Sequence, residues 1–281
     1  MTYDFETLVV SEPRPYLLHV EINRPSKRNS MNDKFWVEFR ECFERIREDT
    51  RARVVIVSGK GDHFSAGLDI AESTNLGRVE KTTQDVARRA FLIRNVAKAM
   101  QASINAVERC PQPVVAAVHG FCIGAGVDLI CACDVRLCSA DANFSVAEAR
   151  LGLAADLGTL QRMPRIVGNE SLCRELAYTG RTFDAAEAAG MGLVSRVLAP
   201  KSGREEVVEA SLRLATDIAR NSPVAVSGTK SNILYGRDHS VEDGMEYNVT
   251  WNMSALQTED LGRAMRAGLK KGGMPPKFSK L

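Results

Sequence analysis

A glycine-rich turn, Gly120–Gly126, is the feature of this sequence best suited to bind negative charge. The apolar segment Pro113–Val118 predicts a buried strand that leads into the turn, and a helix is expected directly after it. Backbone N–H groups at such a junction have no partner within the helix, and the helix dipole adds roughly half a positive charge. The turn is therefore suited to hold an anion or a developing oxyanion.

Two alternatives stay open for this turn when it is considered alone. A dinucleotide-binding fingerprint needs the pattern Gly-x-Gly-x-x-Gly, but Gly124 and Gly126 are followed by Leu129 where the third glycine should stand. A tight strand-to-helix turn that binds no ligand is the second alternative.

A second loop, residues 62–70, has a similar character and follows another apolar segment, Val54–Ser58. If the two segments form neighbouring strands, each loop could direct one N–H group at the same oxygen atom. A thioester carbonyl that gains negative charge needs this arrangement. Removal of one such donor costs roughly 3–4 kcal/mol in other enzymes.

Three acidic residues could transfer protons near these loops. Asp128 lies one turn into the helix after the glycine turn, Glu148 follows an extended segment, and Asp156 stands in the apolar stretch 151–158. We expect Asp156 to be buried, and burial of a carboxyl group raises its pKa by up to roughly 3–5 units. Such a shift prepares a carboxyl group for proton transfer near neutral pH.

Each of the three acids also has a purely structural alternative. Asp128 could form a buried ion pair with Arg136, and Glu148 could pair with Arg150 at the surface. Asp156 could cap a helix that begins at Gly158. The three acids are therefore more informative together than singly.

Strand–turn–helix units recur along the chain and predict a mixed α/β core with crossover connections. After about residue 200 the pattern indicates helices alone, and the polar stretch 72–88 is expected to be mobile. Strands are predicted at Thr7–Val10, Tyr16–Ile22 (joined by a Pro13/Pro15 turn), 54–58, 113–118, 134–139 and 143–146, and helices at 32–49, 89–109, 126–132, 204–220, 223–235, 240–256 and 258–269.

Composition excludes several classes of protein. The net charge of +2 comes from interspersed acids and bases, so the sequence offers no basic stripe for nucleic acid. No apolar run is long enough to span a membrane, and the amino terminus does not resemble a secretory signal. The seven cysteines form no paired metal motif, so no metal site is predicted, and we expect buried, reduced thiols of an intracellular protein.

The carboxyl terminus ends in Ser279-Lys280-Leu281, the tripeptide read by the peroxisomal import receptor. The preceding glycines and prolines, residues 272–276, are expected to keep this tail extended and reachable. The sequence therefore predicts the peroxisomal matrix as the location.

The motifs together resemble the enoyl-CoA hydratase/isomerase (crotonase) family. The similarity is carried by residues 119–129 around the glycine turn, by residues 64–69, and by Asn23-Arg24-Pro25. It implies a right-handed spiral of ββα units over residues 1–200, followed by a helical oligomerisation segment with the targeting tail over residues 201–281. It also implies homotrimers or homohexamers.

Within the family, residues 152–162, 222–226 and 237–241 resemble the delta(3,5)-delta(2,4)-dienoyl-CoA isomerase group. This resemblance implies catalytic roles for Asp128, Glu148 and Asp156, which match the three functional acids of that group. The hydratases of the family carry Glu in place of Asp128 and Gly in place of Asp156, so hydratase activity is the weaker interpretation. We expect Glu148 and Asp156 to move protons between C2 and C6 of a 3,5-dienoyl-CoA, giving the 2,4-isomer in β-oxidation. Asp128 is expected to hold geometry or charge.

The resemblance also implies the remaining contacts with substrate. The backbone N–H groups of Leu68 and Ala125 would form the oxyanion hole, and Ala125 is a departure because close relatives usually carry Gly there. The CoA moiety is part of the substrate, and no separate cofactor is expected. The predicted contacts of the CoA moiety and its thioester are Ala66, Lys27, Arg28 and Gly124.

Two other functions are compatible with the sequence. The first is an ordinary enoyl-CoA hydratase or 3,2-enoyl-CoA isomerase, which shares the oxyanion hole. The second is a non-catalytic relative that binds acyl-CoA or RNA. The near-neutral charge and the presence of all three acids oppose the second function.

Overall fold

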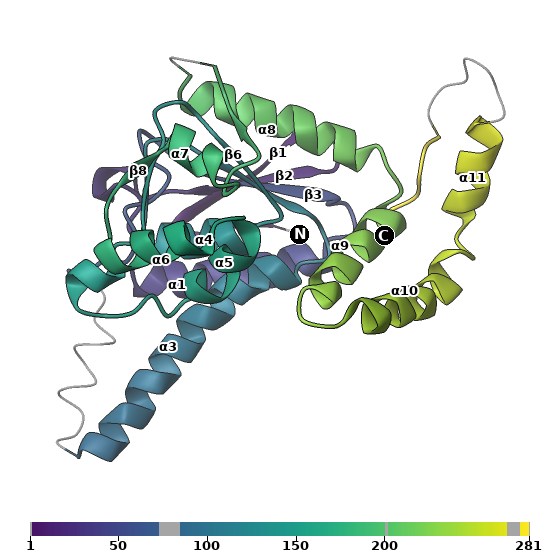
Figure 1. Cartoon of the computed structure of the whole chain (residues 1–281). Helices are drawn as coiled ribbons and strands as arrows, with labels where there is room; N and C mark the ends of the chain where they lie inside the picture. Colours follow the sequence, from purple (N-terminus) through teal and green to yellow (C-terminus); the bar gives the residue numbers. More distant parts are fainter. Residues whose placement is uncertain (1, 73–84, 200–201, 269–275, 281) are drawn as a thin grey trace.

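The computed structural model describes residues 2–72, 85–199, 202–268 and 276–280. These residues form a six-stranded sheet, a small three-stranded sheet and surrounding helices (Figure 1). The mixed α/β class predicted from the sequence is therefore confirmed. The large sheet has the order β1 (Leu8–Arg14), β2 (Leu17–Ile22), β3 (Val54–Gly59), β4 (Val114–Val118), β6 (Val135–Cys138) and β9 (Arg196–Val197).

The amino-terminal strands differ slightly from the sequence prediction. Strand β1 continues through Pro13 to Arg14, and the tight connection to β2 falls at Pro15 and Tyr16, where Tyr16 has φ 70°. An edge strand tolerates proline, because the missing N–H need not serve a ladder bond. Strands β1 and β2 are antiparallel, and every other pair in the large sheet is parallel.

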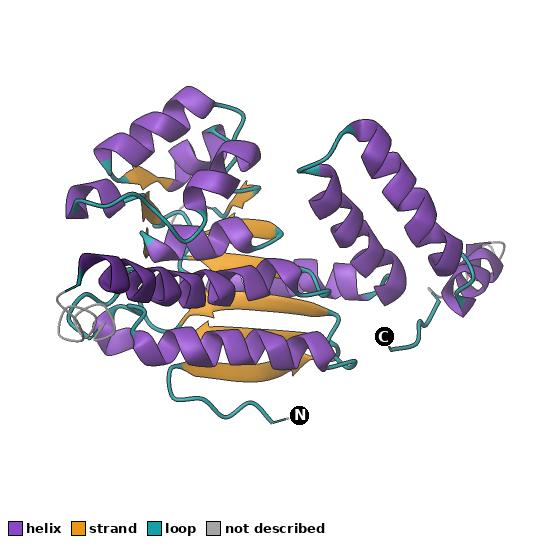
Figure 2. Cartoon of the chain, turned by 90° about the horizontal axis from the view of Figure 1, so that it is seen from below, coloured by secondary structure: helices purple, strands orange, loops and turns teal. Residues whose placement is uncertain are grey.

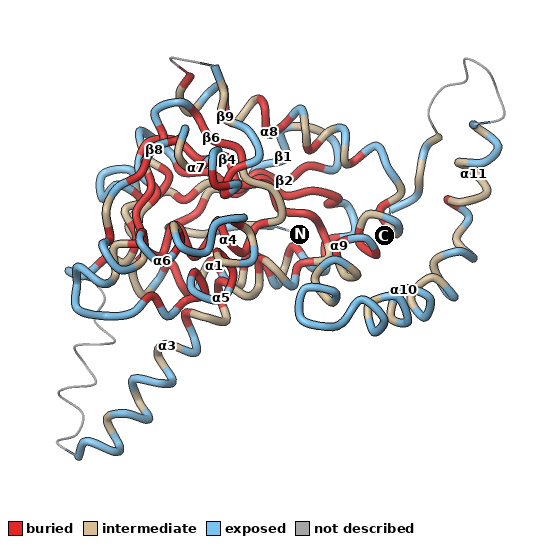
Figure 3. Tube along the Cα trace, viewed as in Figure 1, coloured by how far each residue is buried: buried red, intermediate tan, exposed pale blue. Residues whose placement is uncertain are grey.

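Helices cover both faces of the large sheet, which explains why its central strands are apolar throughout (Figures 1 and 2). In β3, Val55 and Val57 face the core formed with α1, α3 and α4, whereas Val54 and Ile56 face α8. Figure 3 shows the central strands buried along their length. The covering helices are α1 (Asp33–Glu48), α3 (Val86–Arg109), α4 (Ala125–Ala132) and, on the other face, α8 (Arg204–Ala219).

The small sheet and several short helices were not predicted from the sequence, except for the extended segment that becomes β7. They are too short to produce a clear hydrophobic period. The small sheet is built partly from the glycine turn, because β5 lies within residues 120–126, directly before Gly124 and α4. The additional elements are β5 (Phe121–Ile123), β7 (Asn143–Ser145), β8 (Phe183–Asp184), η1 (Pro25–Lys27), η2 (Glu148–Leu151), α5 (Thr159–Ile166), α6 (Glu170–Thr179) and α7 (Ala185–Gly190).

Three carboxyl-terminal helices stand beside the sheet rather than on it (Figure 1). Helix α10 buries no residue within this chain and exposes Val241, Met245, Val249 and Met253 at four-residue spacing (Figure 3). The helices predicted after residue 200 are confirmed to within a few residues at their ends. They are α8, which packs on the sheet, and α9 (Pro223–Gly236), α10 (Val241–Ala255) and α11 (Glu259–Gly268).

Several other expectations concern the termini and loops. All seven cysteines are free and buried. No helix among the described residues has the length and apolar character to cross a membrane. Part of the polar stretch and part of the tail lie outside the described residues, namely 73–84, 269–275 and Leu281. The described part of the tail contacts the core, where Arg53 donates to the carbonyls of Phe278 (2.7 Å) and Ser279 (3.1 Å).

Candidate active site

The two loops singled out from the sequence are joined directly. They follow β3 and β4, which are parallel neighbours as expected. The N–H of Ser65 donates to the Phe121 carbonyl at 2.9 Å, and the N–H of Ile123 donates to the Ser65 carbonyl at 3.0 Å. These two bonds hold residues 65–68 against the start of the glycine turn.

Leu68 is held by a backbone bridge to Met31. The Met31 N–H donates to the Gly67 carbonyl at 2.7 Å, and the Asp69 N–H donates to the Met31 carbonyl at 3.0 Å. Gly67 has φ +86°, and a Cβ atom there would lie 2.6 Å from the Ile123 carbonyl oxygen and 3.4 Å from the Ala125 nitrogen. The missing side chain therefore lets the two loops approach each other. Within the described part of the chain, the Leu68 N–H has no acceptor.

Ala125 is the first residue of α4, and its N–H is one of the groups that a helix leaves unpaired at its start. Gly124 precedes it with φ +52°, a conformation that favours glycine. The N–H groups of Val127 and Asp128 already donate to the Gly124 carbonyl, at 2.7 and 3.2 Å. The structure thus brings the Leu68 and Ala125 segments together, as an oxyanion hole requires.

Asp128 is almost fully buried, with 1% of its surface exposed. Its Oδ1 accepts the Thr159 N–H at 2.6 Å, whereas Oδ2 is buried without a partner among the described residues. Burial raises the pKa of Asp128 to about 6; the Thr159 hydrogen bonding opposes this shift and the charge of Asp156 adds to it. The predicted alternative, a buried ion pair between Asp128 and Arg136, is wrong, because the Arg136 guanidinium donates to backbone carbonyls instead.

Glu148 lies over the glycine turn. Its Oε1 is 3.2 Å from the position that a Cβ atom on Gly124 would occupy, and its Oε2 is buried without a partner among the described residues. Burial raises the pKa of Glu148 to about 7, and the charges of Asp128 and Asp156 add to this shift. The predicted alternative with Arg150 is wrong, since that guanidinium points to the Gly180 carbonyl at 3.5 Å.

Asp156 differs from the expectation. Its side chain is exposed in the chain, although its neighbours Ala155 and Leu157 are buried. The predicted burial of this carboxylate is therefore wrong, because residues 151–154 are exposed and do not cover it. The capping alternative is also wrong: α5 begins after Gly158 with no side-chain cap. The charge of Asp156 nevertheless raises the pKa values of both other acids, so the three carboxyl groups form one electrostatic site.

Three of the residues predicted to contact CoA, Lys27, Arg28 and Ala66, lie in or beside the loop 62–70, whereas Gly124 lies in the glycine turn. The Arg28 carbonyl accepts the Ala66 N–H at 2.9 Å, which ties the two segments together. Lys27 is exposed and forms an ion pair with Glu72 at 3.5 Å. Lys27, Arg28 and Ala66 are therefore neighbours on the Leu68 side of the site.

The residues that support the acids are not evident from the sequence. Thr159 donates its N–H to Asp128, and its own Oγ1 is buried without a partner among the described residues. The side chain of Gln101 donates to the Asp156 carbonyl at 2.6 Å. Since both contacts involve backbone atoms, no pattern of residue types could have revealed them. Among the described residues, no three potential metal ligands cluster.

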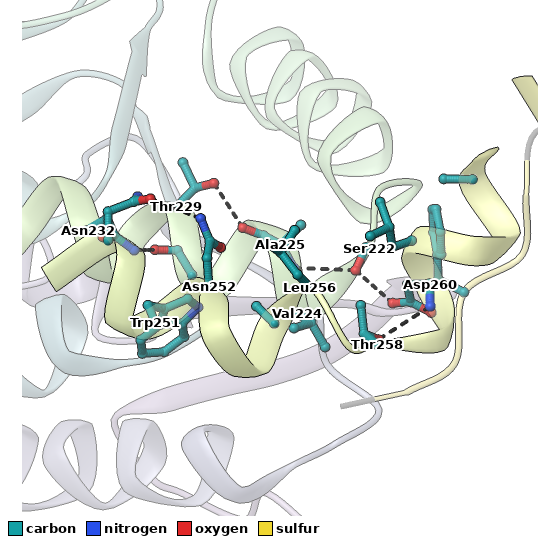
Figure 4. Close-up of a pocket in the computed structure, with 16 residues that line it drawn as sticks. Ser222, Val224, Ala225, Thr229, Asn232, Trp251, Asn252, Leu256, Thr258 and Asp260 are labelled. Carbon is teal, nitrogen blue, oxygen red and sulfur yellow. Dashed lines mark hydrogen bonds between the residues drawn. The ribbon is translucent and has the colours of Figure 1, made fainter. Parts of the chain in front are cut away.

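The cavities distinguish the acid site from the carboxyl-terminal helices. Of the predicted site residues, Asp156 alone lines a cavity of about 590 Å³ between α3, α5 and the end of α9. A separate cavity of about 310 Å³ lies between α9, α10 and α11 (Figure 4). There Ser222 Oγ donates to Asp260 Oδ2 at 2.6 Å, and Trp251 and Leu256 form part of the wall. None of the predicted site residues lines this second cavity.

Comparisons with known proteins agree with this geometry. Residues 15–274 match the family described as enoyl-CoA hydratase/isomerase. The chain is 49% identical over 265 residues to the Homo sapiens protein named "Delta(3,5)-Delta(2,4)-dienoyl-CoA isomerase, mitochondrial", covering 94% of this chain and 80% of that protein. It is 43% identical to the Arabidopsis thaliana protein named "Delta(3,5)-Delta(2,4)-dienoyl-CoA isomerase, peroxisomal", covering 94% and 93%.

Solved structures share the fold. The crystal structure of enoyl-CoA hydratase from Bacillus anthracis superimposes with a TM-score of 0.85 at 28% identity, covering 97% of this chain and 99% of that one. The crotonase fold expected from the motifs is thereby confirmed. Because the family match and the relatives both extend over most of its length, the chain belongs to the enoyl-CoA hydratase/isomerase family.

Proposed function

We propose that this protein is a delta(3,5)-delta(2,4)-dienoyl-CoA isomerase, which converts 3,5-dienoyl-CoA to 2,4-dienoyl-CoA. The observation that carries the proposal is the gathering of three carboxyl groups beside paired backbone donors. The names of relatives that are 43% and 49% identical support it. Such an enzyme acts in the β-oxidation of unsaturated fatty acids.

The reaction begins at C2 of the substrate. Removal of a C2 proton gives an enolate whose charge is delocalised over the thioester carbonyl and both double bonds. The N–H groups of Leu68 and Ala125 stabilise the charge on the thioester oxygen, because neither has an acceptor among the described residues and they lie on adjoining loops. The methyl group of Ala125 leaves this N–H available.

Glu148 and Asp156 are assigned the two proton transfers. Glu148 removes the C2 proton, because its carboxylate lies over Gly124, next to the oxyanion turn. Asp156, protonated from the solvent that reaches its exposed side chain, delivers a proton to C6, so that the double bonds move to C2–C3 and C4–C5, and Glu148 then releases the C2 proton to solvent. One proton leaves carbon and one returns, and the net charge of the substrate is unchanged. Asp128 holds the site through Thr159 and adds negative charge near Glu148.

The CoA moiety is assigned to the Leu68 side of the site. The Ala66 carbonyl accepts the adenine amino group, while Lys27 and Arg28 contact phosphates. Gly124 leaves room for the thioester, since a side chain there would approach Glu148. The proton transfers themselves use only carboxyl groups and backbone donors, so the assigned steps need no further cofactor.

Location and assembly are part of the proposal. The tripeptide Ser279-Lys280-Leu281 supports import into the peroxisomal matrix, as does the name of the Arabidopsis relative, whereas the human relative is named mitochondrial. Deletion of Leu281 from a fluorescently tagged chain should abolish peroxisomal import. The exposed apolar stripe of α10 supports a homotrimer or homohexamer.

A direct assay tests the proposed function. Purified enzyme should convert 3,5-dienoyl-CoA to a product with the ultraviolet absorbance of a 2,4-dienoyl thioester. Turnover of 2-enoyl-CoA to a hydroxyacyl product, or of 3-enoyl-CoA to 2-enoyl-CoA, should be at least about 10-fold slower, because neither transition state can use the proton donor that the proposed site places at C6. Faster hydration than dienoyl isomerisation would contradict the proposal.

A further inference from the structure

We infer that a polar stripe on α3, formed by Gln101, Asn105 and Glu108, is a positioning device that holds Asp156 at the C6 end of the substrate. The inference rests on the proposed function and extends it to residues outside the three acids. The stripe acts on the segment 156–162 rather than on the substrate. Its three members stand at positions i, i+4 and i+7 and therefore share one face of the helix.

The first contact of the stripe reaches Asp156 itself. Gln101 Nε2 donates to the Asp156 carbonyl at 2.6 Å. This bond fixes the backbone of a residue whose side chain is exposed and whose neighbours 151–154 are also exposed. A carboxyl group on such a segment needs an external support if it is to meet a carbon atom at a defined distance.

The second contact fixes the far end of the same segment through Arg162. Arg162 Nε and Nη2 donate to the two carboxylate oxygens of Glu108 at 3.1 and 3.0 Å, and Nη2 also donates to Asn105 Oδ1 at 2.7 Å. Side-chain exposures of 10% and 15% show that this ion pair is largely removed from water. A two-pronged arginine–carboxylate pair fixes orientation as well as distance.

Gly158 makes this arrangement possible. It has φ +131°, and a Cβ atom there would lie 2.0 Å from Arg162 Nη1. The guanidinium thus occupies the space that a side chain at residue 158 would need. The turn between Asp156 and Thr159 is therefore folded onto Arg162, with Asp128 holding Thr159 from the other side.

Ion pairs keep Glu108 charged, so that it can hold Arg162. Arg237 also binds Glu108, and Arg165 binds Asp238, so the three arginines that line this cavity, Arg162, Arg165 and Arg237, all have carboxylate partners. Burial by itself would raise the pKa of Glu108, but the bonds from Arg162 and Arg237 lower it to about 2. Glu108 therefore remains a carboxylate over the whole range in which Glu148 titrates.

The stripe acts on one half of the proposed reaction. Removal of the C2 proton depends on Glu148 and the oxyanion hole, neither of which contacts Gln101 or Arg162 in the described structure. Return of a proton at C6 depends on Asp156. Loss of the stripe should therefore slow isomerisation while exchange of the C2 proton with solvent continues.

The experiment uses full-length enzyme with 3,5-dienoyl-CoA in D₂O. Two rates are measured: deuterium incorporation at C2 of recovered substrate and formation of the 2,4-dienoyl product. In Gln101→Met and Arg162→Met, isomerisation should fall at least about 10-fold, with C2 exchange changed less than about 3-fold. Arg162→Lys should restore little, because lysine cannot form the two-pronged pair. Arg40→Met, which removes an exposed pair with Glu44 on α1, is the matched control.

The outcomes are separable. Equal loss of both rates, or no loss of either, in the variants would overturn the positioning role, since a general structural defect cannot change their ratio. If Arg162→Met does not fold, Gln101→Met alone decides, because that side chain is only half-buried. If the wild-type enzyme does not isomerise 3,5-dienoyl-CoA, the proposed function fails and the inference falls with it.

Discussion

Glu148 and Asp156, the two acids assigned to proton transfer, lie in different surroundings. Glu148 is half-buried over the glycine turn, and its pKa is raised to about 7, first by burial and then by the charge of Asp128. Asp156 is exposed on a segment supported by α3. A base with a pKa near 7 is well suited to remove a proton from C2 at neutral pH. The proton donor at C6 depends above all on its correct position relative to the substrate.

The two acids also differ in the contacts that hold their segments in place. The Glu148 side rests on main-chain bonds between Ser65, Phe121 and Ile123, and on glycines that bring the loops together. The Asp156 side rests on side chains of α3, because Gln101 binds the Asp156 carbonyl and Glu108 binds Arg162. Outside its glycines, the first side should therefore tolerate most side-chain changes, whereas single side-chain changes should disturb the second. Four measurements test this contrast.

Glu148→Gln should have the largest effect. Without a base at C2, both C2 deuterium exchange and isomerisation should fall by about 10³-fold, within the range for loss of a general base. The two rates can be followed together in D₂O by mass spectrometry and ultraviolet absorbance. Glu44→Gln, on the exposed face of α1, is the control. Retained exchange in the Glu148 variant would assign the C2 proton to another acid.

Asp156→Asn should have a smaller and selective effect. Isomerisation should fall by about 10²-fold, because solvent reaches this side and replaces part of the lost donor. Exchange at C2 should continue at close to the wild-type rate, in contrast to Glu148→Gln. Parallel loss of both rates would mean that Asp156 takes part in the first step, and the contrast between the two ends would disappear.

Sequence patterns predicted the half of the molecule that is built from regular elements. The predicted strand at 54–58 and the predicted helices at 32–49 and 89–109 match β3, α1 and α3 to within a few residues. The glycine turn and the loop at 62–70 were paired correctly, because parallel neighbouring strands end at one edge of a sheet. These features depend on local composition, which sequence analysis measures directly.

The environments of the acids were predictable only in part. The high burial of Asp128 follows from the apolar helix around it. The exposure of Asp156 does not, because apolar neighbours in the sequence suggested burial, while the segment 151–154 turns outward. The contact between Gln101 and Asp156 joins residues 55 positions apart through a backbone carbonyl. No spacing rule encodes such a contact.

Asp128→Asn tests how much the buried, charged carboxylate of Asp128 lowers the free energy of unfolding. The pKa of Asp128 rises from its ordinary 3.8 to about 6 on folding, so between these values the native state holds a proton that the unfolded state has lost. The free energy of unfolding of the wild type should therefore decrease as pH rises through this window. Asparagine keeps an oxygen for Thr159 and carries no charge, so the variant should be more stable at pH 8 by about 2 kcal/mol.

Urea unfolding at pH 4 and pH 8 measures this difference. The two proteins should have similar unfolding free energies at pH 4 and should diverge as pH increases. A variant that is less stable than the wild type at pH 8 would mean that the charged form of Asp128 is stabilised by a partner in solution. It would also remove the reason for assigning a raised pKa to this side of the site.

Asp156→Asn should have the smallest effect when stability rather than activity is measured. Its carboxylate is exposed, and the bond to Gln101 uses the main-chain carbonyl, which the substitution leaves in place. The free energy of unfolding at pH 8 should therefore change by less than about 0.5 kcal/mol, as for most surface positions. Together with the loss of isomerisation, this result would show that the exposed acid serves the reaction and not the fold. A change above about 1 kcal/mol would instead give Asp156 a structural role, and the difference between the two ends of the site would then lie in packing rather than in proton transfer.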